Sequence, residues 1–365
     1  MEINNLYVNN FRNLASQTLE LSQGLNIFYG DNAQGKTNLL ESAYLCCLGK
    51  SVRTERDKDL IRIGCDSCYV KLGYASISGT RDISIAISKD KKVASINTLP
   101  LARIGELLGY LNCIYFSPDE ISVITLSPSQ RRRFLDIDLC QLNKQYYHAL
   151  VRFNRILVQR NNLLKKSNNI TTLKDSLSIW DAQLAKEGGL LTYQRKLFCT
   201  RLAEIVLDTH KFLTQKEKLN MTYIPSVDGD TVEEITANYL AKLTASVEKD
   251  FAQRFTTTGC QRDDIKFCVD DADIRVFGSQ GQQRTTALSL KLAELQLFYD
   301  ITKDYPILLL DDVLSELDRT RQKALLSYND KVQIILTGTK VDKMLTKHIN
   351  SSRFVIKNGL ATKLD

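Results

Sequence analysis

The chain has 365 residues, of which 43% are hydrophobic and 25% are charged, a composition that is ordinary for a globular protein. No apolar run approaches the ~20 residues of a membrane helix, and the start of the chain carries an acid and no apolar core, so we expect neither a membrane span nor a secretory signal. The nine cysteines follow no framework of spacings, which excludes a disulfide-rich secreted class and suggests a reducing, cytoplasmic location.

The formal net charge is +7, and the segment from Arg131 to Lys218 carries more than the whole of this excess. No acidic residue occurs from Leu139 to Lys174. A basic excess in one segment favours a polyanionic partner, although the need for solubility can produce the same pattern.

Residues 1–23 alternate apolar and polar side chains on either side of a turn at Phe11–Leu14, which predicts a pair of strands. The following stretch, from Gly24 to Leu40, predicts a strand, a glycine-rich loop and the start of a helix. Arg12 lies in the turn. It is either a plain surface charge or a residue near the ligand of that loop, because the strand pair leads directly into the loop.

The loop fits the phosphate-binding pattern G-x-x-x-x-G-K-[ST] at Gly30, Gly35, Lys36 and Thr37. Backbone N–H groups and the N-terminus of the following helix form an anion site, and the glycines let the backbone approach closely. Lys36 reaches the β- and γ-phosphates of a nucleotide, and the Thr37 hydroxyl joins the shell of a Mg²⁺ ion. The alternative is a chance glycine-rich turn, which the apolar strand before the loop and the apolar helix face after it disfavour.

Beyond the loop, the patterns predict a helix and then three antiparallel strands, at 38–48, 70–78, 83–87 and 93–96. We expect a short amphipathic helix at 103–111 and a buried strand at 113–116. The pattern becomes helical from Ser129 onward, with a basic-faced helix at 141–166 and a second long stretch that Gly188-Gly189 kinks or breaks.

The last third of the chain returns to mixed helix and strand. A short strand is expected at 274–277, followed by Ser279-Gln280-Gly281-Gln282 and an amphipathic helix. Buried strands are expected at 306–312, 332–336 and 354–356. We therefore predict a nucleotide-binding domain in two parts, residues 1–126 and 257–365, interrupted by a mainly helical domain, residues 127–256.

Asp311 and Asp312 end the buried strand PILLLDD. Beside a phosphate loop, Asp311 would hold Mg²⁺ opposite Thr37, and Asp312 would polarise the attacking water as a general base. Strand-end carboxylates without a ligand are the alternative, but the phosphate loop in the same chain favours the functional interpretation.

Ser279 and Gly281 precede a helix, and a hydroxyl, a glycine N–H and a helix N-terminus together form an anion site. The alternative is a serine N-cap with a glycine turn. Because the chain already has a complete phosphate loop, we expect two subunits to face head to tail. Each would then supply Ser279 and Gly281 to the γ-phosphate that Lys36 of the other holds.

Four stretches occur in the order GDNAQGKTNLLES, SQGQQRT, LLLDDVLSELD and ILTGT, and they resemble the ATP-binding cassette ATPases of the SMC type. The chain has no long coiled coil, and it carries the stretch SPSQRRRFLD at 127–136. In both respects it resembles the RecF family, and the resemblance extends over essentially the whole chain. The resemblance implies an α/β fold, an ABC-type (SMC-like) P-loop ATPase head with mixed sheets and an inserted mainly helical domain.

The resemblance also assigns roles to residues. The ATP-binding Walker A residues would be Gly30, Asp31, Asn32, Ala33, Gln34, Gly35, Lys36 and Thr37. Arg12 matches a nucleotide-contacting position, and Asp311 and Asp312 match Walker B. The signature that acts in trans would be Ser279, Gly281 and Gln282, and the D-loop would include Ser315 and Asp318. Lys36 and Asp312 are thus the expected catalytic residues, and Thr37 and Asp311 the expected metal ligands.

Some positions depart from the general cassette pattern. Asp312 stands where many cassette ATPases have Glu, and the switch is Thr337 or Thr339 where they have His; both differences suggest slow turnover. No Gln occupies the expected Q-loop, where Ser117, Asp119 or Glu120 stands instead.

The activity that the resemblance implies is DNA-stimulated ATP hydrolysis, with ATP and Mg²⁺ as cofactors, by a protein that forms an ATP-dependent homodimer. The implied partners are gapped single- and double-stranded DNA, bound without sequence preference, and RecR and RecO, which help to place RecA. The implied location is the cytoplasm near the nucleoid, with no membrane partner.

Two groups of basic residues are candidates for DNA contact. Arg131, Arg132 and Arg133 could also be a solvated helix start or could form ion pairs between subunits. Lys144, Arg152, Arg155 and Lys166 lie on one helix face, and phosphate contacts there would give salt-sensitive binding.

Two other classes of function fit parts of the pattern. An ATPase subunit of a membrane transporter would have a short connection between phosphate loop and signature, and a switch His. A small-molecule kinase would use Ser279 and Gly281 only as a cap.

Overall fold

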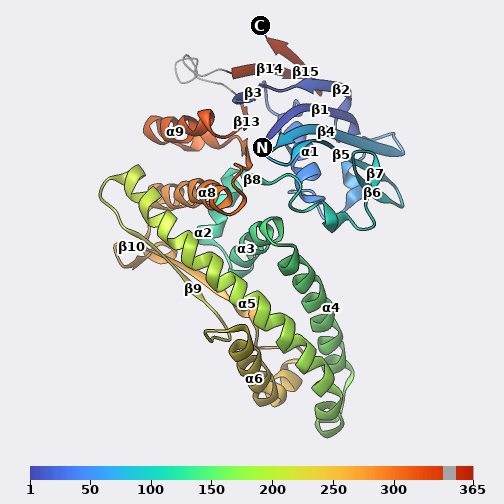
Figure 1. Cartoon of the computed structure of the whole chain (residues 1–365), viewed down its shortest axis with the longest axis vertical. Coiled ribbons are helices and arrows are strands. Elements are labelled where there is room, and N and C mark those ends of the chain that lie inside the picture. The colour runs from blue at the N-terminus through green and yellow to red at the C-terminus, as the bar shows by residue number, and fades with distance from the viewer. Residues whose placement is uncertain (340–350, 365) are drawn as a thin grey trace. The chain divides into compact units, whose positions relative to one another are not determined.

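A computed structural model of the chain describes residues 1–339 and 351–364, with the side chains at 120–122 and 329 excepted (Figure 1). The chain forms two compact units. Unit 1 consists of Met1–Ser122, Phe212–Thr214 and Gln280–Asp365, and unit 2 consists of Val123–Lys211 and Gln215–Ser279. None of the helices in the described residues is both long and apolar enough to cross a bilayer.

The first sheet of unit 1 has six strands in the order β15-β14-β3-β13-β12-β8. Their bounds are β3 Leu25–Tyr29, β8 Cys113–Phe116, β12 Ile307–Asp311, β13 Ile334–Gly338, β14 Ser351–Lys357 and β15 Leu360–Leu364. All pairs except β14–β15 are parallel. The centre of the sheet is apolar and buried on both faces, as is usual for parallel sheets, so its polar groups are concentrated where the strands end.

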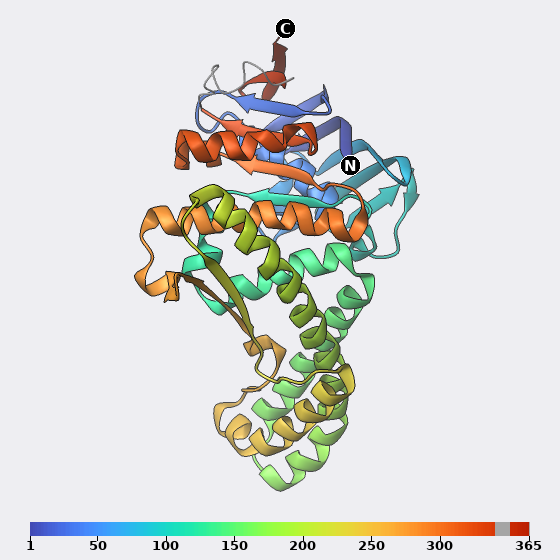
Figure 2. The same cartoon turned by 60° about the vertical axis from the view of Figure 1, so that its left-hand side comes forward.

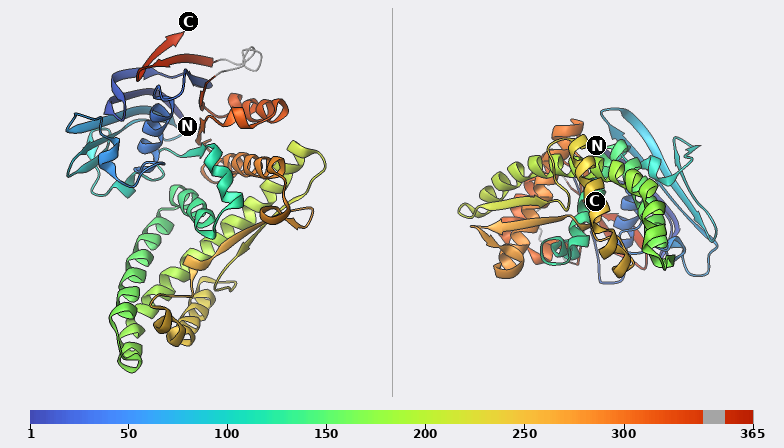
Figure 3. Two further views of the ribbon diagram at one scale, coloured as in Figure 1. Left: turned by 180° about the vertical axis from the view of Figure 1, so that it is seen from behind. Right: turned by 90° about the horizontal axis from the view of Figure 1, so that it is seen from below.

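The second sheet of unit 1 is antiparallel, in the order β2-β1-β4-β5-β6-β7. Its strands are β1 Glu2–Phe11, β2 Leu14–Glu20, β4 Ser67–Ser76, β5 Gly79–Ser88, β6 Lys92–Ile96 and β7 Leu99–Pro100. Helix α1 (Lys36–Leu48) contacts strands of both sheets, so it is packed between them (Figure 3). This explains why its residues from Leu39 to Leu48 are all buried.

The other helices of unit 1 are short or peripheral to the first sheet. Helix α8 (Gln280–Thr302) contacts β8, and α9 (Arg319–Leu326) follows the single turn η5 (Val313–Glu316). Single turns also occur at η1 (Asp57–Leu60), η3 (Pro118–Ile121) and η6 (Ser327–Asp330). The helix predicted at 103–111 is wrong, since only one turn, η2 (Ile104–Leu107), forms there.

Unit 2 is built on helices α2 (Ser122–Thr125), α3 (Pro128–Leu142), α4 (Lys144–Lys166), α5 (Ile170–Thr214) and α6 (Val232–Gln253). Helix α5 is continuous, so of the predicted kink or break at Gly188-Gly189 the break does not occur (Figure 2). A Cβ atom on Gly188 would lie 2.4 Å from the ring of Tyr239 on α6. The glycine pair therefore allows two helices to approach closely, which a sequence pattern alone does not distinguish from a break.

A three-stranded sheet in unit 2 was not expected. Strand β9 (Leu219–Ile224) pairs with β10 (Asp264–Val269), which pairs with β11 (Ala272–Asp273), and Figure 3 shows the extended ribbon from behind. Because β10 pairs with β9, the segment 257–279 belongs to unit 2 and not to the nucleotide-binding part in which it was predicted. Residues Ile274–Phe277 form a helical turn, α7, and not the predicted strand.

Candidate functional site

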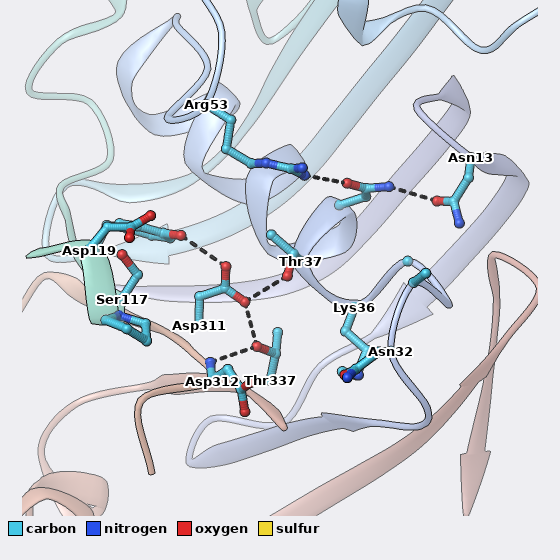
Figure 4. A pocket seen from close by; sticks show the side chains of 15 residues that line it. Asn13, Asn32, Lys36, Thr37, Arg53, Ser117, Asp119, Asp311, Asp312 and Thr337 are labelled. Carbon is cyan, nitrogen blue, oxygen red and sulfur yellow. Dashed lines mark hydrogen bonds between the residues drawn. The ribbon is translucent and has the colours of Figure 1, made fainter. Parts of the chain in front are cut away.

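A cleft of about 620 Å³ opens in unit 1 where α1 begins and where β8, β12 and β13 end (Figure 4). Parallel strands bring their carboxyl ends to one edge of a sheet, so side chains distant in sequence meet there. The residues that line the cleft are Asn13, Asn32, Ala33, Gly35, Lys36, Thr37, Asn38, Arg53, Tyr115, Ser117, Pro118, Asp119, Asp311, Asp312 and Thr337.

The loop between β3 and α1 has the backbone that its glycines allow. At Gly30 a Cβ atom would lie 2.4 Å from the carbonyl oxygen of Ile356, and Gly35 has a φ of 111°. The turn after β14 holds the loop from outside: the amides of Asn358 and Gly359 donate to the side chain and carbonyl oxygens of Gln34, at 2.7 and 2.9 Å. The loop is therefore fixed in shape by a strand at the other end of the chain.

Lys36 is the first residue of α1 and is only 8% exposed. Its Nζ donates to the carbonyl oxygens of Gly30 and Asp31, at 2.7 and 2.8 Å. Within the part of the chain that the structure describes, no carboxylate forms an ion pair with Lys36. Its charge is thus held in place by neutral groups beside a helix N-terminus, whose backbone amides favour an anion.

The carboxylate of Asp311 accepts hydrogen bonds from three hydroxyl groups. Its Oδ1 accepts from Thr37 at 2.9 Å and from Thr337 at 2.6 Å, and its Oδ2 accepts from Tyr115 at 3.0 Å. The register of the sheet explains this, because Asp311 pairs directly with Thr337 on β13. The Thr37 hydroxyl and the Asp311 carboxylate are hard oxygen donors of the kind that Mg²⁺ takes from proteins.

Asp312 follows in a left-handed conformation, with a φ of 54° that a non-glycine residue rarely adopts. Its amide donates to the hydroxyl of Thr337 at 3.0 Å, which fixes the turn (Figure 4). Burial raises the pKa of the Asp312 carboxyl; the charge of Lys36 acts in the opposite direction, and the charges of Asp311 and Glu316 raise it further. A half-buried carboxylate with a raised pKa suits a proton acceptor.

Arg12 is paired with a buried carboxylate, and its predicted nucleotide contact stays a prediction. The guanidinium of Arg12 donates two hydrogen bonds, at 2.8 and 3.0 Å, to the fully buried carboxylate of Glu41, and Arg12 does not line the cleft. Its neighbour Asn13 does line it, and so does Arg53, which sequence reasoning missed. Arg53 is one of several charged residues in a polar loop, and nothing in the pattern separates it from the others.

The signature residues lie at the start of α8. Gly281 is exposed, Gln282 is partly exposed, and neither lines the cleft of its own chain. Ser279, the last residue of unit 2, is also exposed. In the same helix Arg284 forms an ion pair with Glu316, which connects the first turns of α8 to the D-loop.

The D-loop residues have local roles in this chain. The hydroxyl of Ser315 donates to the carbonyl oxygen of Asp312 at 2.8 Å, and the carboxylate of Asp318 caps α9 through the amide of Arg321. Both are exposed.

The structure narrows two open choices. Thr337 lines the cleft and contacts Asp311, whereas Thr339 is exposed and does not line it, so Thr337 is the one of the two that the structure favours for the predicted switch. At the Q-loop position Ser117 and Asp119 both line the cleft, and the side chain of Glu120 lies outside the described residues.

The candidate DNA-binding residues separate into two classes. Arg131 is 2% exposed, and its guanidinium donates to both carboxylate oxygens of Asp264, at 2.5 and 3.0 Å. Arg132 donates to the carbonyl oxygen of Asp263 at 2.8 Å, whereas Arg133 is exposed. The structure therefore corrects the prediction for Arg131, because its charge is already neutralised inside unit 2.

On α4, Lys144, Arg155 and Lys166 are exposed, as the predicted polar face requires. Arg152 is also accessible, but it forms a two-bond ion pair with Glu187 on α5, at 2.7 and 2.9 Å. Arg160 lies on the same helix but is fully buried.

Comparisons with known proteins agree with this geometry. The sequence profile of the RecF/RecN/SMC N terminal domain matches residues 2–359. The chain is 42% identical to proteins named DNA replication and repair protein RecF from Lachnoclostridium phytofermentans, over 97% of each chain, and from Clostridium botulinum strain 657, over 98% of this chain and 99% of the relative.

Solved structures agree as well. A recombination mediator protein RecF with ATP, described as part of the RecFOR pathway, superposes with a TM-score of 0.91 at 33% identity, covering 100% of this chain and 98% of that one. An Smc head domain from Pyrococcus furiosus shares the fold, with a TM-score of 0.59 at 16% identity, covering 100% of this chain and 96% of that one. The predicted fold class is confirmed.

Proposed function

The chain belongs to the RecF family of DNA replication and repair proteins, and from this premise we propose that it is an ATP-gated dimeric DNA clamp with slow ATPase activity. In this proposal it acts with RecO and RecR at gapped single-strand/double-strand junctions, where RecA is loaded. The observation that carries the proposal is the convergence of Lys36, Thr37, Asp311 and Asp312 on one cleft.

The proposed reaction is the attack of water on the γ-phosphate of ATP. Lys36 holds the β- and γ-phosphates, and the N-terminus of α1 adds backbone donors. Thr37 and Asp311 hold Mg²⁺, which when bound neutralises charge on the phosphates. Asp312, whose pKa is raised by burial, orients the water and accepts its proton.

Slow turnover follows from the side chains at two positions. Asp312 is one methylene shorter than Glu, so it reaches less far toward the water. Thr337 is committed to Asp311 and to the amide of Asp312, at 2.6 and 3.0 Å, and its hydroxyl has no ionisable group that could exchange a proton at neutral pH.

The proposed dimer places the signature of each copy on the nucleotide of the other. Two observations support this proposal. Ser279 and Gly281 are exposed at a helix start, and Gly281 does not line the cleft of its own chain. ATP then stabilises the dimer by binding both copies, and hydrolysis releases it.

The proposed DNA surface is the exposed basic face of α4, with Lys144, Arg155 and Lys166. Phosphate contacts by these side chains would be independent of sequence. A transporter ATPase subunit and a small-molecule kinase are disfavoured. Along the sequence, most of unit 2 with this basic face lies between the phosphate loop and the signature, and Thr337 takes the place of the switch His of a transporter subunit.

A pair of variants tests the proposal. Lys36→Ala should abolish ATP binding and ATP-dependent DNA retention, whereas Ser279→Arg should retain ATP binding but fail to dimerise. Solution mass with and without ATP, repeated with gapped duplex over a salt series, measures both outcomes. Normal ATP-dependent dimers from Ser279→Arg would refute the dimer.

A further inference from the structure

The carboxylate of Glu41 is completely buried, and yet it is connected to the cleft. Glu41 lies on α1, between the two sheets of unit 1, where an unpaired charge would be strongly destabilising. Arg12 satisfies it with two hydrogen bonds. If balance of charge were its only role, no further partner would be needed.

The same carboxylate organises the loop that carries Arg53. The hydroxyl of Ser51 donates to Glu41 Oε1 at 2.5 Å and accepts from the backbone amides of Arg53 and Thr54, both at 3.0 Å. A hydroxyl has a single hydrogen to donate, so the bond to Glu41 leaves its lone pairs directed at those amides. The carboxylate thus fixes the backbone of Arg53 through Ser51.

Among the described residues, the side chain of Arg53 has only a long ion pair, with a carboxylate that Arg12 already satisfies. Its guanidinium lies 3.9 Å from Glu41 Oε2 and donates to the neutral Oδ1 of Asn38 at 3.0 Å, and Asn38 donates in turn to Asn13 at 2.8 Å (Figure 4). Arg53 is 52% exposed and lines the cleft with Asn13 and Asn38. Within the described residues it uses one of its five N–H donors, so the others can meet a phosphate.

We propose that Glu41 is a positioning residue for nucleotide binding: it holds Arg53 at the cleft, through Ser51 and by direct attraction, with the charge still available to the phosphates of ATP. This inference rests on the proposed function, since it requires that the cleft binds ATP. Glu41 itself does not line the cleft and acts only through Arg53.

A double-mutant cycle tests the inference on the full-length protein. The Kd for ATP with Mg²⁺ is measured by calorimetry for the wild type, Glu41→Gln, Arg53→Ala and the double variant. We expect each single variant to weaken binding about tenfold, the loss expected for one charge-assisted contact, and the double variant to be no weaker than Arg53→Ala alone. The proposal would be overturned if the loss of affinity in the double variant equalled the product of the two single losses, or if Glu41→Gln left the Kd unchanged.

Stability is measured in parallel, as the Tm without nucleotide. Glu294→Gln is the matched control, because Glu294 is also a buried carboxylate, 1% exposed and paired with Lys291 on α8; it should leave the Kd unchanged whatever its Tm. If Glu41→Gln does not fold, Ser51→Ala takes its place in the cycle and decides between the same outcomes. Failure of the proposed function is a separate result, in which the wild type and Lys36→Ala show the same Kd.

Discussion

Two buried charges of unit 1, those of Lys36 and Asp311, line a cleft, whereas the buried arginines of unit 2 are held in ion pairs. Lys36 is held by two backbone carbonyls, and Asp311 by three hydroxyl groups, so neither charge is neutralised by an ion pair in the described chain. Arg160, in contrast, is 0% exposed and pairs with Asp181 and Asp250, at 2.6 and 2.7 Å.

A further buried arginine of unit 2 follows the same rule. Arg195 pairs with Asp136 and Asp263, at 2.8 and 2.9 Å, and donates to the hydroxyl of Tyr146 at 2.9 Å. Such networks are costly to break, because removing one partner leaves an uncompensated charge in the interior. A buried charged residue that we propose contacts a ligand is therefore distinguished from one that stabilises the fold by its hydrogen-bond and ion-pair partners, and not by its burial.

The largest effect is expected for Asp312→Asn. An amide cannot accept the proton of the attacking water, so ATP turnover should fall about 10²–10⁴-fold, the usual contribution of a general base, while ATP binding and dimerisation persist. Phosphate release and calorimetry measure the two properties. Asp66→Asn, at an exposed carboxylate on the surface of unit 1, is the control, and undiminished turnover in Asp312→Asn would exclude the proposed base.

Arg160→Met tests whether the buried ion pairs of unit 2 stabilise its fold. This change leaves the buried carboxylates of Asp181 and Asp250 without their cationic partner, so the free energy of unfolding should fall by about 3–5 kcal/mol. Arg155→Met, on the exposed face of the same helix, should change it by less than about 0.5 kcal/mol. Chemical denaturation measures both, and equal stability of the two variants would show that the buried network does not hold unit 2.

DNA binding should separate the basic residues by their partners. Arg155→Ala should weaken DNA binding at every sequence and reduce the slope of log K against log salt by about 1, because one phosphate contact is lost. Arg131→Ala should lower the Tm instead, with an unchanged slope, because its guanidinium is already paired with Asp264. A salt titration with gapped duplex measures both slopes; the same slope for Arg155→Ala and wild type would remove α4 from the proposed surface.

The smallest effect concerns the pH dependence of turnover. Asp312 must be ionised to accept a proton, so turnover rises as pH increases through its pKa, and the raised pKa places this rise at higher pH than for an exposed Asp. Glu316→Gln removes a negative charge that raises this pKa, so the rise should move to lower pH. Steady-state rates across the acidic range measure it. Glu20→Gln, on β2, is the control, and a shift in the other direction would contradict the assignment.

The parts of the site that sequence patterns predict are those fixed by local chemistry. A phosphate loop needs glycines because the backbone approaches the phosphates closely, and it needs Lys-Thr to contact the phosphates and Mg²⁺. The apolar strand before Asp311 is predicted from its composition. Arg53 and Glu41 could not be found in this way, since their importance depends on contacts between a helix and a loop that no periodicity records.

The insert shows the same division. Its long helices follow from the helical pattern of apolar residues, but the burial of Arg160 is explained only by the tertiary contacts with Asp181 and Asp250. The pairing of β9 with β10 was missed because the two strands are short and lie far apart in sequence, with α6 between them. Local propensity is weak for such strands, whose stability comes from the partner.

The sequence by itself determined the family, the fold class and the loop that we propose binds phosphate, because these depend on residue types at fixed spacing. Only the tertiary structure decided which charges are available to a ligand, that Asn13 and not Arg12 lines the cleft, and that Arg131 belongs to the interior. The physical reason is that the availability of a charge depends on the groups within hydrogen-bonding distance, and the fold brings those groups together from distant parts of the chain.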